Sequence, residues 1–229
     1  MKAIVMNLPS STKRLEDFRR DYPKCLPEAT VWPAKSGAEV TPPNWWKASA
    51  NNYAIGVNFR DIVALENALA GKRRQTLLLF EDDVVFTEDF PKRYDAFLKA
   101  VSDDWDMLYL GGDHVGNLLP VQISETVLRC RCTWAPHAVV IRPSAFQAIL
   151  DALDTATPWA CEHRHECRLG ELMRNRLKVY APVNPLAGQR GGIPSDNAHF
   201  TRERDEYFLP YLYLDAQGVV YSYPPETEA

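Results

Sequence analysis

The sequence feature that most constrains the fold is a run of apolar residues that ends in three consecutive carboxylates. Residues 76–80 read Thr-Leu-Leu-Leu-Phe, and Glu81, Asp82 and Asp83 follow directly. A fully apolar run of this length is typical of a strand at the centre of a sheet that is covered on both faces. Because adjacent carboxylates repel one another and are costly to desolvate, we expect them at the carboxyl end of this strand, where open α/β sheets bind ligands.

Strand-like and helix-like segments alternate along the chain, which predicts an α/β fold with a central, mostly parallel sheet. We expect strands near residues 2–8, 31–32, 76–80, 106–110, 133–142 and 178–180, and helices near 10–22, 58–70, 91–101, 143–153 and 166–177. Residues 211–214 and 219–223 flank a turn-forming segment and predict a terminal hairpin. Since no linker marks a boundary, we predict one domain over 1–229, with a core of about 2–197 and a C-terminal extension, 198–229.

The three carboxylates predict a site for a hard divalent cation. Oxygen ligands suit Mg²⁺ or Mn²⁺, and phosphate groups of a substrate can complete the coordination shell. Alternation along an extended chain places Glu81 and Asp83 on one face and Asp82 on the other. The alternative is a solvated acidic turn that ends the strand, and the motif alone leaves both interpretations open.

Composition limits the partners and the compartment. The 229 residues carry a formal net charge of −4, which argues against a surface built as a whole to bind nucleic-acid backbones, although a local basic groove is compatible with it. No segment approaches the roughly 18 apolar residues that span a bilayer, and the opening apolar stretch is too short for a signal peptide. With five cysteines and no export signal, we predict reduced thiols and a cytoplasmic protein.

Further short elements accompany the acidic motif Leu79-Phe80-Glu81-Asp82-Asp83. They are Asn7-Leu8 with Arg14 and Phe18, residues 32–37 (WPAKSG), residues 56–61 (GVNFRD), residues 105–111 (WDMLYLG), residues 137–141 with Ala145, and Val179-Tyr180 with Pro185, Gln189 and Ser195-Asp196. In this order they resemble the lipopolysaccharide-type glycosyltransferases, glycosyltransferase family 25, which are related to the collagen galactosyltransferases. The chain departs from the family pattern at Ser36, where Asp is usual, and at Arg60-Asp61, where a Ser-His pair is usual.

The resemblance implies a GT-A, Rossmann-like fold and transfer of a sugar, most often from a UDP-sugar, with Mn²⁺ or Mg²⁺ bridging the protein and the diphosphate. In such an enzyme the metal stabilises the negative charge of the leaving group. Glu81 and Asp83 would hold the metal, and Asp82 would belong to the donor site. The other residues that the resemblance places in the donor site are Asn7, Leu8, Arg14, Ala34 and Gln189.

Residues late in the chain supply the remaining candidates. Arg190, within Gly188–Gly192, could meet a phosphate through its guanidinium and the loop's backbone N–H groups, or could simply lie in a connecting loop. In such folds a third metal ligand usually comes from a late His or acidic residue, and we select His165. The other candidates for this ligand are Glu162, His163, Glu166 and His199. As general base we expect Asp113, just past a strand end, or Glu166, at a helix start.

The sequence leaves more than one acceptor and more than one class of activity open. A positive stripe on one expected helix would favour an anionic acceptor; it comprises Arg164, Arg168, Arg174, Arg176 and Lys178. A glycan or lipid-linked saccharide, as in lipopolysaccharide biosynthesis, fits this expectation. A base in nucleic acid, unstacked with the help of Trp45-Trp46, is a second acceptor. A non-catalytic nucleotide-binding domain and a nucleotidyl- or phosphotransferase are the other functions that these carboxylates allow.

Overall fold

The computed structural model describes residues 1–70, 75–114, 118–154, 156, 158, 165–191, 211–215 and 217–223. Its strands are β1 (Lys2–Asn7), β2 (Ala29–Pro33), β3 (Leu77–Glu81), β4 (Val84–Phe86), β5 (Met107–His114), β6 (Val121–Gln122), β7 (Val127–Arg129), β8 (Thr133–Ile141), β9 (Val179–Pro182), β10 (Ala187–Gln189), β11 (Tyr211–Leu214) and β12 (Val220–Tyr223). Its helices are α1 (Thr12–Asp21), η1 (Gly37–Glu39, a single 3₁₀ turn), α2 (Ala50–Ala70), α3 (Phe90–Ala100), α4 (Pro143–Ala152) and α5 (Glu166–Asn175).

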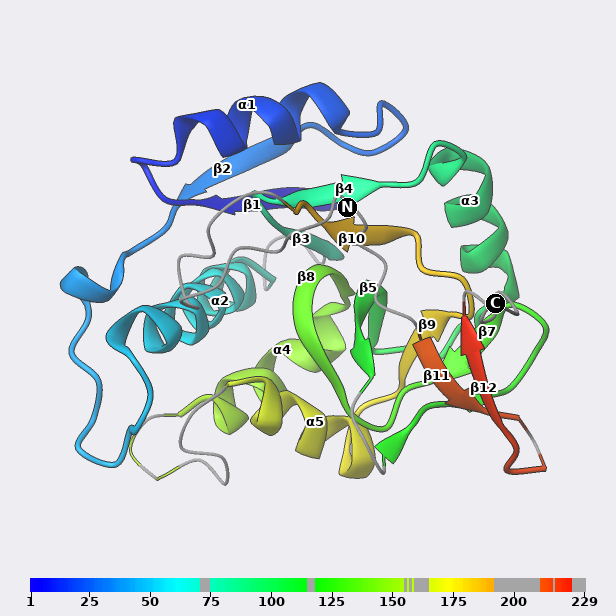
Figure 1. Cartoon of the computed structure of the whole chain (residues 1–229). Coiled ribbons are helices and arrows are strands. Elements are labelled where there is room, and N and C mark those ends of the chain that lie inside the picture. Colours follow the sequence, from blue (N-terminus) through cyan, green and yellow to red (C-terminus); the bar gives the residue numbers. More distant parts are fainter. Residues whose placement is uncertain are drawn as a thin grey trace.

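A ten-stranded sheet forms the centre of the described chain, in the order β12-β11-β6-β7-β9-β5-β8-β3-β1-β2 (Figure 1). The pairings give β1, β2, β3, β5, β6, β9 and β11 one direction and β7, β8 and β12 the other. The α/β class with a mostly parallel central sheet is therefore confirmed. A separate antiparallel pair, β4 with β10, lies beyond the end of β3.

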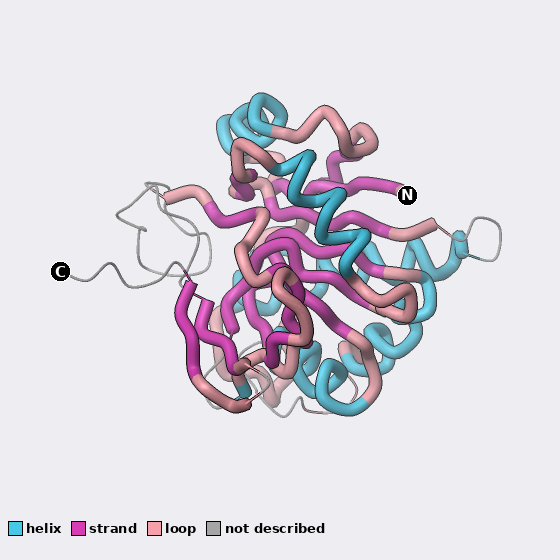
Figure 2. The backbone as a smooth tube through the Cα atoms, turned by 90° about the vertical axis from the view of Figure 1, so that its right-hand side faces the viewer, coloured by secondary structure: helices cyan, strands magenta, loops and turns pink. Residues whose placement is uncertain are grey.

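Alternation along β3 divides the core into two layers, one on each face of the sheet. Leu77 and Leu79 belong to the apolar cluster that α2, α4 and α5 cover. Leu78 and Phe80 belong to the cluster that α1 and α3 cover. Figure 2 shows the strands running between these helices. Because all four side chains are at most 1% exposed, β3 is buried on both faces, as its fully apolar sequence predicts.

Helix α2 begins at Ala50, whereas the apolar spacing predicted a start near residue 58. Residues 50–57 contain Asn51, Asn52 and Gly56, which have poor helix propensity, so the local signal is weak. Tertiary contacts overcome this weakness: Tyr53 and Ala54 are buried, and the first turn packs directly against η1.

Strand β5 continues through Gly111 and Gly112 to His114, so Asp113 lies inside a strand, opposite Trp134 of β8, and not past a strand end as expected. Neighbouring atoms lie so close to these two glycines that a side chain at either position would not fit. A Cβ on Gly111 would lie 1.8 Å from the carbonyl oxygen of Ala187, and one on Gly112 would lie 2.7 Å from a Thr133 methyl carbon. The sequence did not predict β10. This strand contains Ala187 and can lie against β5 because residue 111 is glycine.

The segment 211–223 forms an antiparallel hairpin of β11 and β12, and Leu214 of β11 pairs with Val121 of β6, so the hairpin extends the central sheet. Among the described helices, none combines the length and the apolarity that crossing a bilayer requires.

Candidate functional site

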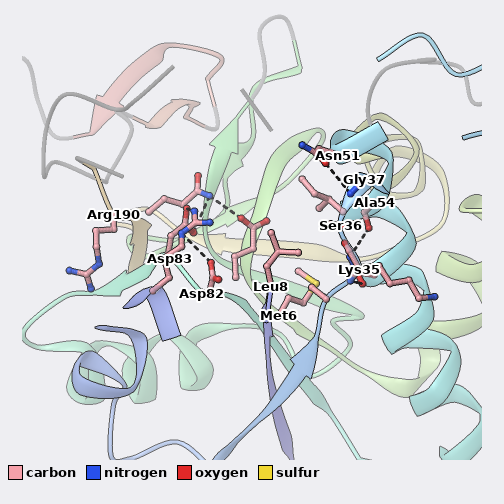
Figure 3. Close-up of a pocket in the computed structure, with 16 residues that line it drawn as sticks. Met6, Leu8, Lys35, Ser36, Gly37, Asn51, Ala54, Asp82, Asp83 and Arg190 are labelled. Carbon is pink, nitrogen blue, oxygen red and sulfur yellow. Dashed lines mark hydrogen bonds and ion pairs between the residues drawn. The ribbon is translucent and has the colours of Figure 1, made fainter. Parts of the chain in front are cut away.

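The carboxyl ends of β1, β2 and β3 meet at one edge of the sheet, and a cavity of about 270 Å³ opens there (Figure 3). Two walls enclose it, with Met6 and Leu8 between them. The charged wall comprises Arg14, Glu81, Asp82, Asp83, Gln189 and Arg190. The loop–helix wall comprises Ala34, Lys35, Ser36 and Gly37 after β2, and Asn51, Ala54, Ile55 and Asn58 of α2. Parallel strands bring these distant segments together because their carboxyl ends share one edge.

Asp82 is held by residues from the first strand and the first helix. Asn7, the last residue of β1, donates from Nδ2 to Asp82 Oδ2 at 2.7 Å and to the Ser11 carbonyl at 3.0 Å. Arg14 of α1 approaches Asp82 Oδ1 with Nε at 3.5 Å and Asp83 Oδ2 with Nη2 at 3.3 Å. The guanidinium therefore spans two of the three carboxylates.

Gln189 joins the other pair of carboxylates. Its register opposite Val84 in the β10–β4 pair directs its side chain to the acidic motif. The amide Nε2 lies 3.1 Å from Glu81 Oε2 and 3.5 Å from Asp83 Oδ1, so both carboxylates face one point. Glu81 and Asp83 thus share a partner, while Asp82 turns to Asn7, as strand alternation predicts.

The electrostatic balance of the charged wall is unfavourable to three ionised carboxylates. Burial, followed by the charges of Asp83, Glu166 and Asp82, raises the pKa of Glu81 to about 8 against the opposing effect of Arg14. The free site therefore favours a proton on Glu81 far more than an ordinary carboxyl group would. A cation bound beside this carboxyl would replace that proton and relieve the repulsion.

Arg190 adds a second guanidinium to this wall. Its backbone N–H donates to the Asp83 carbonyl at 2.7 Å, which fixes the start of its side chain next to the acidic motif. Its Nη2 forms an ion pair with Asp21 at the end of α1. Its Nε is buried and makes no hydrogen bond to the described residues. Arg14 and Arg190 thus both line the charged wall, and guanidinium groups suit the binding of a phosphate group.

The loop–helix wall is nearly neutral and has its backbone already hydrogen-bonded. Lys35 is its charged member, and its ammonium lies 2.7 Å from Asp61 Oδ2. Asn58, 4% exposed, pairs its side-chain amide with both the N–H and the carbonyl of Lys35 at 2.9 Å. Sequence analysis selected only Ala34 of this wall. Its missed signal is Asn58, a buried polar residue among the mostly apolar buried residues of α2.

The cavity brings together eight of the predicted site residues: Leu8, Arg14, Ala34, Glu81, Asp82, Asp83, Gln189 and Arg190. Asn7 does not line the cavity but donates a hydrogen bond to Asp82, which does. Asp113, His165 and Glu166 are described but are not among the cavity's lining residues. The His165 ring lies 6.0 Å from the Phe59 ring, and its Nδ1 lies 3.4 Å from Glu166 Oε2. Glu162, His163, His199 and the Ser195-Asp196 element lie outside the described residues.

The donor set fits a divalent cation at Glu81 and Asp83. These carboxylates converge on the Gln189 amide nitrogen, and burial together with the neighbouring negative charges raises the pKa of Glu81. The described part of the chain contains no cluster of three or more His, Cys, Asp or Glu side chains arranged for a metal. Mg²⁺ and Mn²⁺ are commonly held by one or two carboxylates, with water and substrate phosphates as the remaining ligands.

Trp46, one of the two tryptophans considered for unstacking a nucleic-acid base, is a packing residue. Its side chain is 8% exposed, its Nε1 donates to the Ser49 carbonyl at 3.1 Å, and its ring lies 5.3 Å from that of Tyr53. Trp45 is only partly buried and packs edge-on against it. The pair therefore contributes to the core beside α2.

No protein-family model matches the sequence, and no curated protein matches it. The structure is similar to that of A197 from STIV (13% identity over 91% of this chain and 94% of that chain, TM-score 0.44). It is similar to a glycosyltransferase involved in the glycosylation of the major capsid of PBCV-1 (8% identity, 79% and 80% covered, TM-score 0.47). It is also similar to a UDP-glucose pyrophosphorylase complexed with UDP-glucose (9% identity, 80% and 90% covered, TM-score 0.40). Likenesses at this level assign no activity to this chain.

Proposed function

We propose that this chain is a metal-dependent glycosyltransferase of the hexosyltransferase class, which transfers a sugar from a nucleoside diphosphate donor, most simply a UDP-sugar, to a hydroxyl group. One observation carries the proposal: a single cavity joins a wall of carboxylates and guanidiniums to a nearly neutral wall at the carboxyl ends of three parallel strands. The charged wall suits the metal and the diphosphate, and the neutral wall suits the nucleoside.

Each wall has a defined task in this proposal. Mn²⁺ or Mg²⁺ at Glu81 and Asp83 would act as the Lewis acid that stabilises the departing diphosphate. Arg14 and Arg190 bind the phosphate oxygens, and Asn7 keeps Asp82 in place against the Arg14 guanidinium. Ala34–Gly37, with Ala54 and Ile55 opposite, receive the nucleoside.

Acceptor deprotonation is assigned to Glu166 or Asp113. We favour Glu166 because its charge contributes to the raised pKa of Glu81. Asp113 lies partly buried in β5. The third metal ligand, for which His165 was selected, stays a prediction, as does the cytoplasmic location.

A saccharide is the acceptor we favour, because the sequence elements resemble the lipopolysaccharide-type family. A glycan or lipid-linked saccharide would supply the attacking hydroxyl. The burial of Trp46 removes one of the two side chains that were considered for unstacking a nucleic-acid base. The nucleic-acid acceptor is therefore the weaker alternative.

Thermal unfolding with nucleoside diphosphates, with and without Mn²⁺, tests the donor site. A ligand at about 100 times its Kd stabilises the fold by roughly 2.7 kcal/mol, which raises Tm by several degrees. We expect this shift for UDP only with Mn²⁺, and we expect Asp83→Asn to abolish it. Asp95→Asn is the matched control, because Asp95 pairs with Lys99 on the surface of α3. If no nucleotide shifts Tm, the proposal is wrong.

Reaction products separate this proposal from its alternatives. Incubation with a UDP-sugar and Mn²⁺ should release UDP slowly by hydrolysis, and faster with a suitable acceptor. Release of pyrophosphate from a nucleoside triphosphate and a sugar phosphate would identify a nucleotidyltransferase. Binding without any turnover would identify a nucleotide-binding domain.

A further inference from the structure

We propose that Asn58 is a positioning residue for the donor: its buried amide fixes the loop 34–37, so that the nucleoside end of the cavity is formed before the donor arrives. The inference rests on the proposed function of the same site. It concerns a residue in the middle of α2, on the loop–helix wall of the cavity.

Hydrogen bonds occupy both the acceptor and the donor groups of the Asn58 side chain. Oδ1 accepts from the Lys35 N–H at 2.9 Å and from the Trp32 Nε1–H at 3.4 Å, and Nδ2 donates to the Lys35 carbonyl at 2.9 Å. Nδ2 also donates to the Ala54 carbonyl one turn earlier at 2.8 Å. By pairing with both the backbone N–H and the backbone carbonyl of Lys35, the Asn58 side chain makes the hydrogen bonds that a neighbouring strand would make. β2 is an edge strand, and Asn58 supplies this pairing just beyond its end at Pro33.

Three further anchors act on the same loop. The Gly37 N–H donates to Asn51 Oδ1 at 2.9 Å, and the Ser36 N–H donates to Glu39 Oε2 at 2.8 Å. The Ala34 N–H donates to the Asn7 carbonyl at 2.9 Å. Every backbone N–H from Ala34 to Gly37 is therefore bonded within the protein. The loop's shape is set by these bonds and does not depend on a ligand.

Gly37 shows how closely the loop is held to the helix. A Cβ at this position would lie 2.2 Å from Asn51 Oδ1 and 2.5 Å from the Asn51 backbone nitrogen. Such an approach leaves no space for the loop to move inward, and the Asn58 and Asn51 bonds prevent it from moving outward. The gap between Ala34–Gly37 and Ala54 is thereby fixed.

Packing alone does not require asparagine at this position. Phe59, Ile62 and Val63 of the same helix are fully buried apolar residues, and an apolar side chain at residue 58 would continue their surface. It would, however, leave the N–H and carbonyl of Lys35 without their partner. Pre-ordering a binding loop improves affinity mainly by lowering the entropy lost on binding. Loss of Asn58 should therefore weaken the nucleoside contact and spare the diphosphate contact.

Calorimetric titration with UDP and with inorganic pyrophosphate, each with Mn²⁺, tests this division. Pyrophosphate probes the charged wall alone, whereas UDP probes both walls. We expect Asn58→Ala to weaken UDP binding about tenfold or more and pyrophosphate binding less than about twofold. Asn67→Ala is the matched control, because Asn67 lies on the same helix and its amide contacts Gln147 on the surface. It should change neither affinity.

Asn51→Ala is the second variant, which keeps the test available if Asn58→Ala does not fold. The Asn51 side chain is exposed, so its removal should leave the fold intact while freeing Gly37. It should weaken UDP binding severalfold, again with little effect on pyrophosphate. The inference is overturned if folded variants bind UDP as the wild type does, or if both ligands weaken equally. If the wild type binds neither ligand, the proposed function itself fails and this inference fails with it.

Discussion

At the scale of single residues, the three carboxylates differ because each has its own partners. Asp82 accepts from Asn7, Asp83 lies beside Arg14, and Glu81 lies beside Gln189. Glu81 accepts from the neutral amide of Gln189, and burial together with the neighbouring carboxylate charges raises its pKa. The partners of the three carboxylates therefore differ in charge.

The raised pKa of Glu81 predicts a pH-dependent stability. Unfolding returns this carboxyl from a pKa of about 8 to its usual 4.5, so the unfolded state releases a proton between these values and stability falls as pH rises from 4.5 to 8. Glu81→Gln removes this penalty. In chelator, we expect the variant to be more stable than wild type by roughly 1–2 kcal/mol at pH 8, because one pKa unit corresponds to about 1.4 kcal/mol and the carboxyl is partly exposed. The difference should vanish near pH 4.

Urea unfolding at a series of pH values measures this effect, and Glu81→Gln should show the flatter profile. Glu171→Gln is a suitable control, since Glu171 lies on α5 in a surface ion pair with Arg168. A Glu81→Gln profile parallel to that of the wild type would show that Glu81 titrates normally.

The bond between Asn7 and Asp82 predicts a second effect at this scale. Asn7→Asp replaces the donor with a carboxylate, so two buried acceptors would face each other where a 2.7 Å bond now lies. We expect a loss of about 1–3 kcal/mol in unfolding free energy at pH 7, partly regained at acidic pH as a carboxyl is protonated. Chemical denaturation at pH 7 and pH 5 measures it. A loss of the same size at both pH values would point to a cause other than charge repulsion.

At the scale of elements, the cavity depends on strands that end at the same edge and on one short strand that is added to them. β10 places Gln189 beside the acidic motif, and it can lie there because β5 has glycine at residue 111. The Ala187 carbonyl occupies the space that a side chain on Gly111 would need. A glycine in one strand thus determines the position of a polar residue in another.

Gly111→Ala should therefore damage the fold and the site together. The new methyl group would overlap the Ala187 carbonyl, and overpacking of this kind typically costs about 1–3 kcal/mol or more. Displacement of β10 should also weaken the Mn²⁺-dependent binding of UDP, which calorimetric titration at a temperature below Tm would detect. Gly218→Asn serves as control, because a Cβ there meets nothing within 4 Å and Asn tolerates its φ of +84°. Unchanged stability in Gly111→Ala would contradict the close approach.

At the scale of the whole molecule, the sheet separates two apolar layers that share no side chains. Ile4 and Leu79, opposite each other in the β1–β3 pair, lie in the layer under α2, α4 and α5. Leu78 lies in the layer under α1 and α3. The cavity lies at the edge of this sheet. Its charged wall includes Arg14 of α1, which covers one layer, and its loop–helix wall includes residues of α2, which covers the other.

This separation predicts a pattern of additivity. Ile4→Val alone should cost about 0.5–1.5 kcal/mol, and Leu78→Ala alone about 2–5 kcal/mol. Combined, these changes on opposite faces should add to within about 0.5 kcal/mol, whereas Ile4→Val with Leu79→Ala, which share a face, should deviate by more. Urea unfolding of the single and double variants measures both sums. Equal deviations in the two pairs would mean that the layers are coupled through the sheet.

The sequence by itself determined the α/β class, the position of β3 and most of the charged wall. The unbroken apolar pattern of Leu77–Phe80 predicts burial on both faces without information about neighbouring strands. The carboxylates follow this run directly in the sequence. Leu8, Arg14, Ala34 and Gln189 came from resemblance to a family pattern, and the cavity unites them.

Only the tertiary structure decided the loop–helix wall beyond Ala34, the start of α2 at Ala50 and the strand β10. Asn58 carries no local signal of its role, because its partners lie on Lys35, 23 residues earlier in the chain. Gly111 likewise reads as the end of a strand until the Ala187 carbonyl is placed against it. Local pattern reports whether a side chain is buried or exposed, whereas the identity of its partner depends on which distant segments the sheet brings to the same edge.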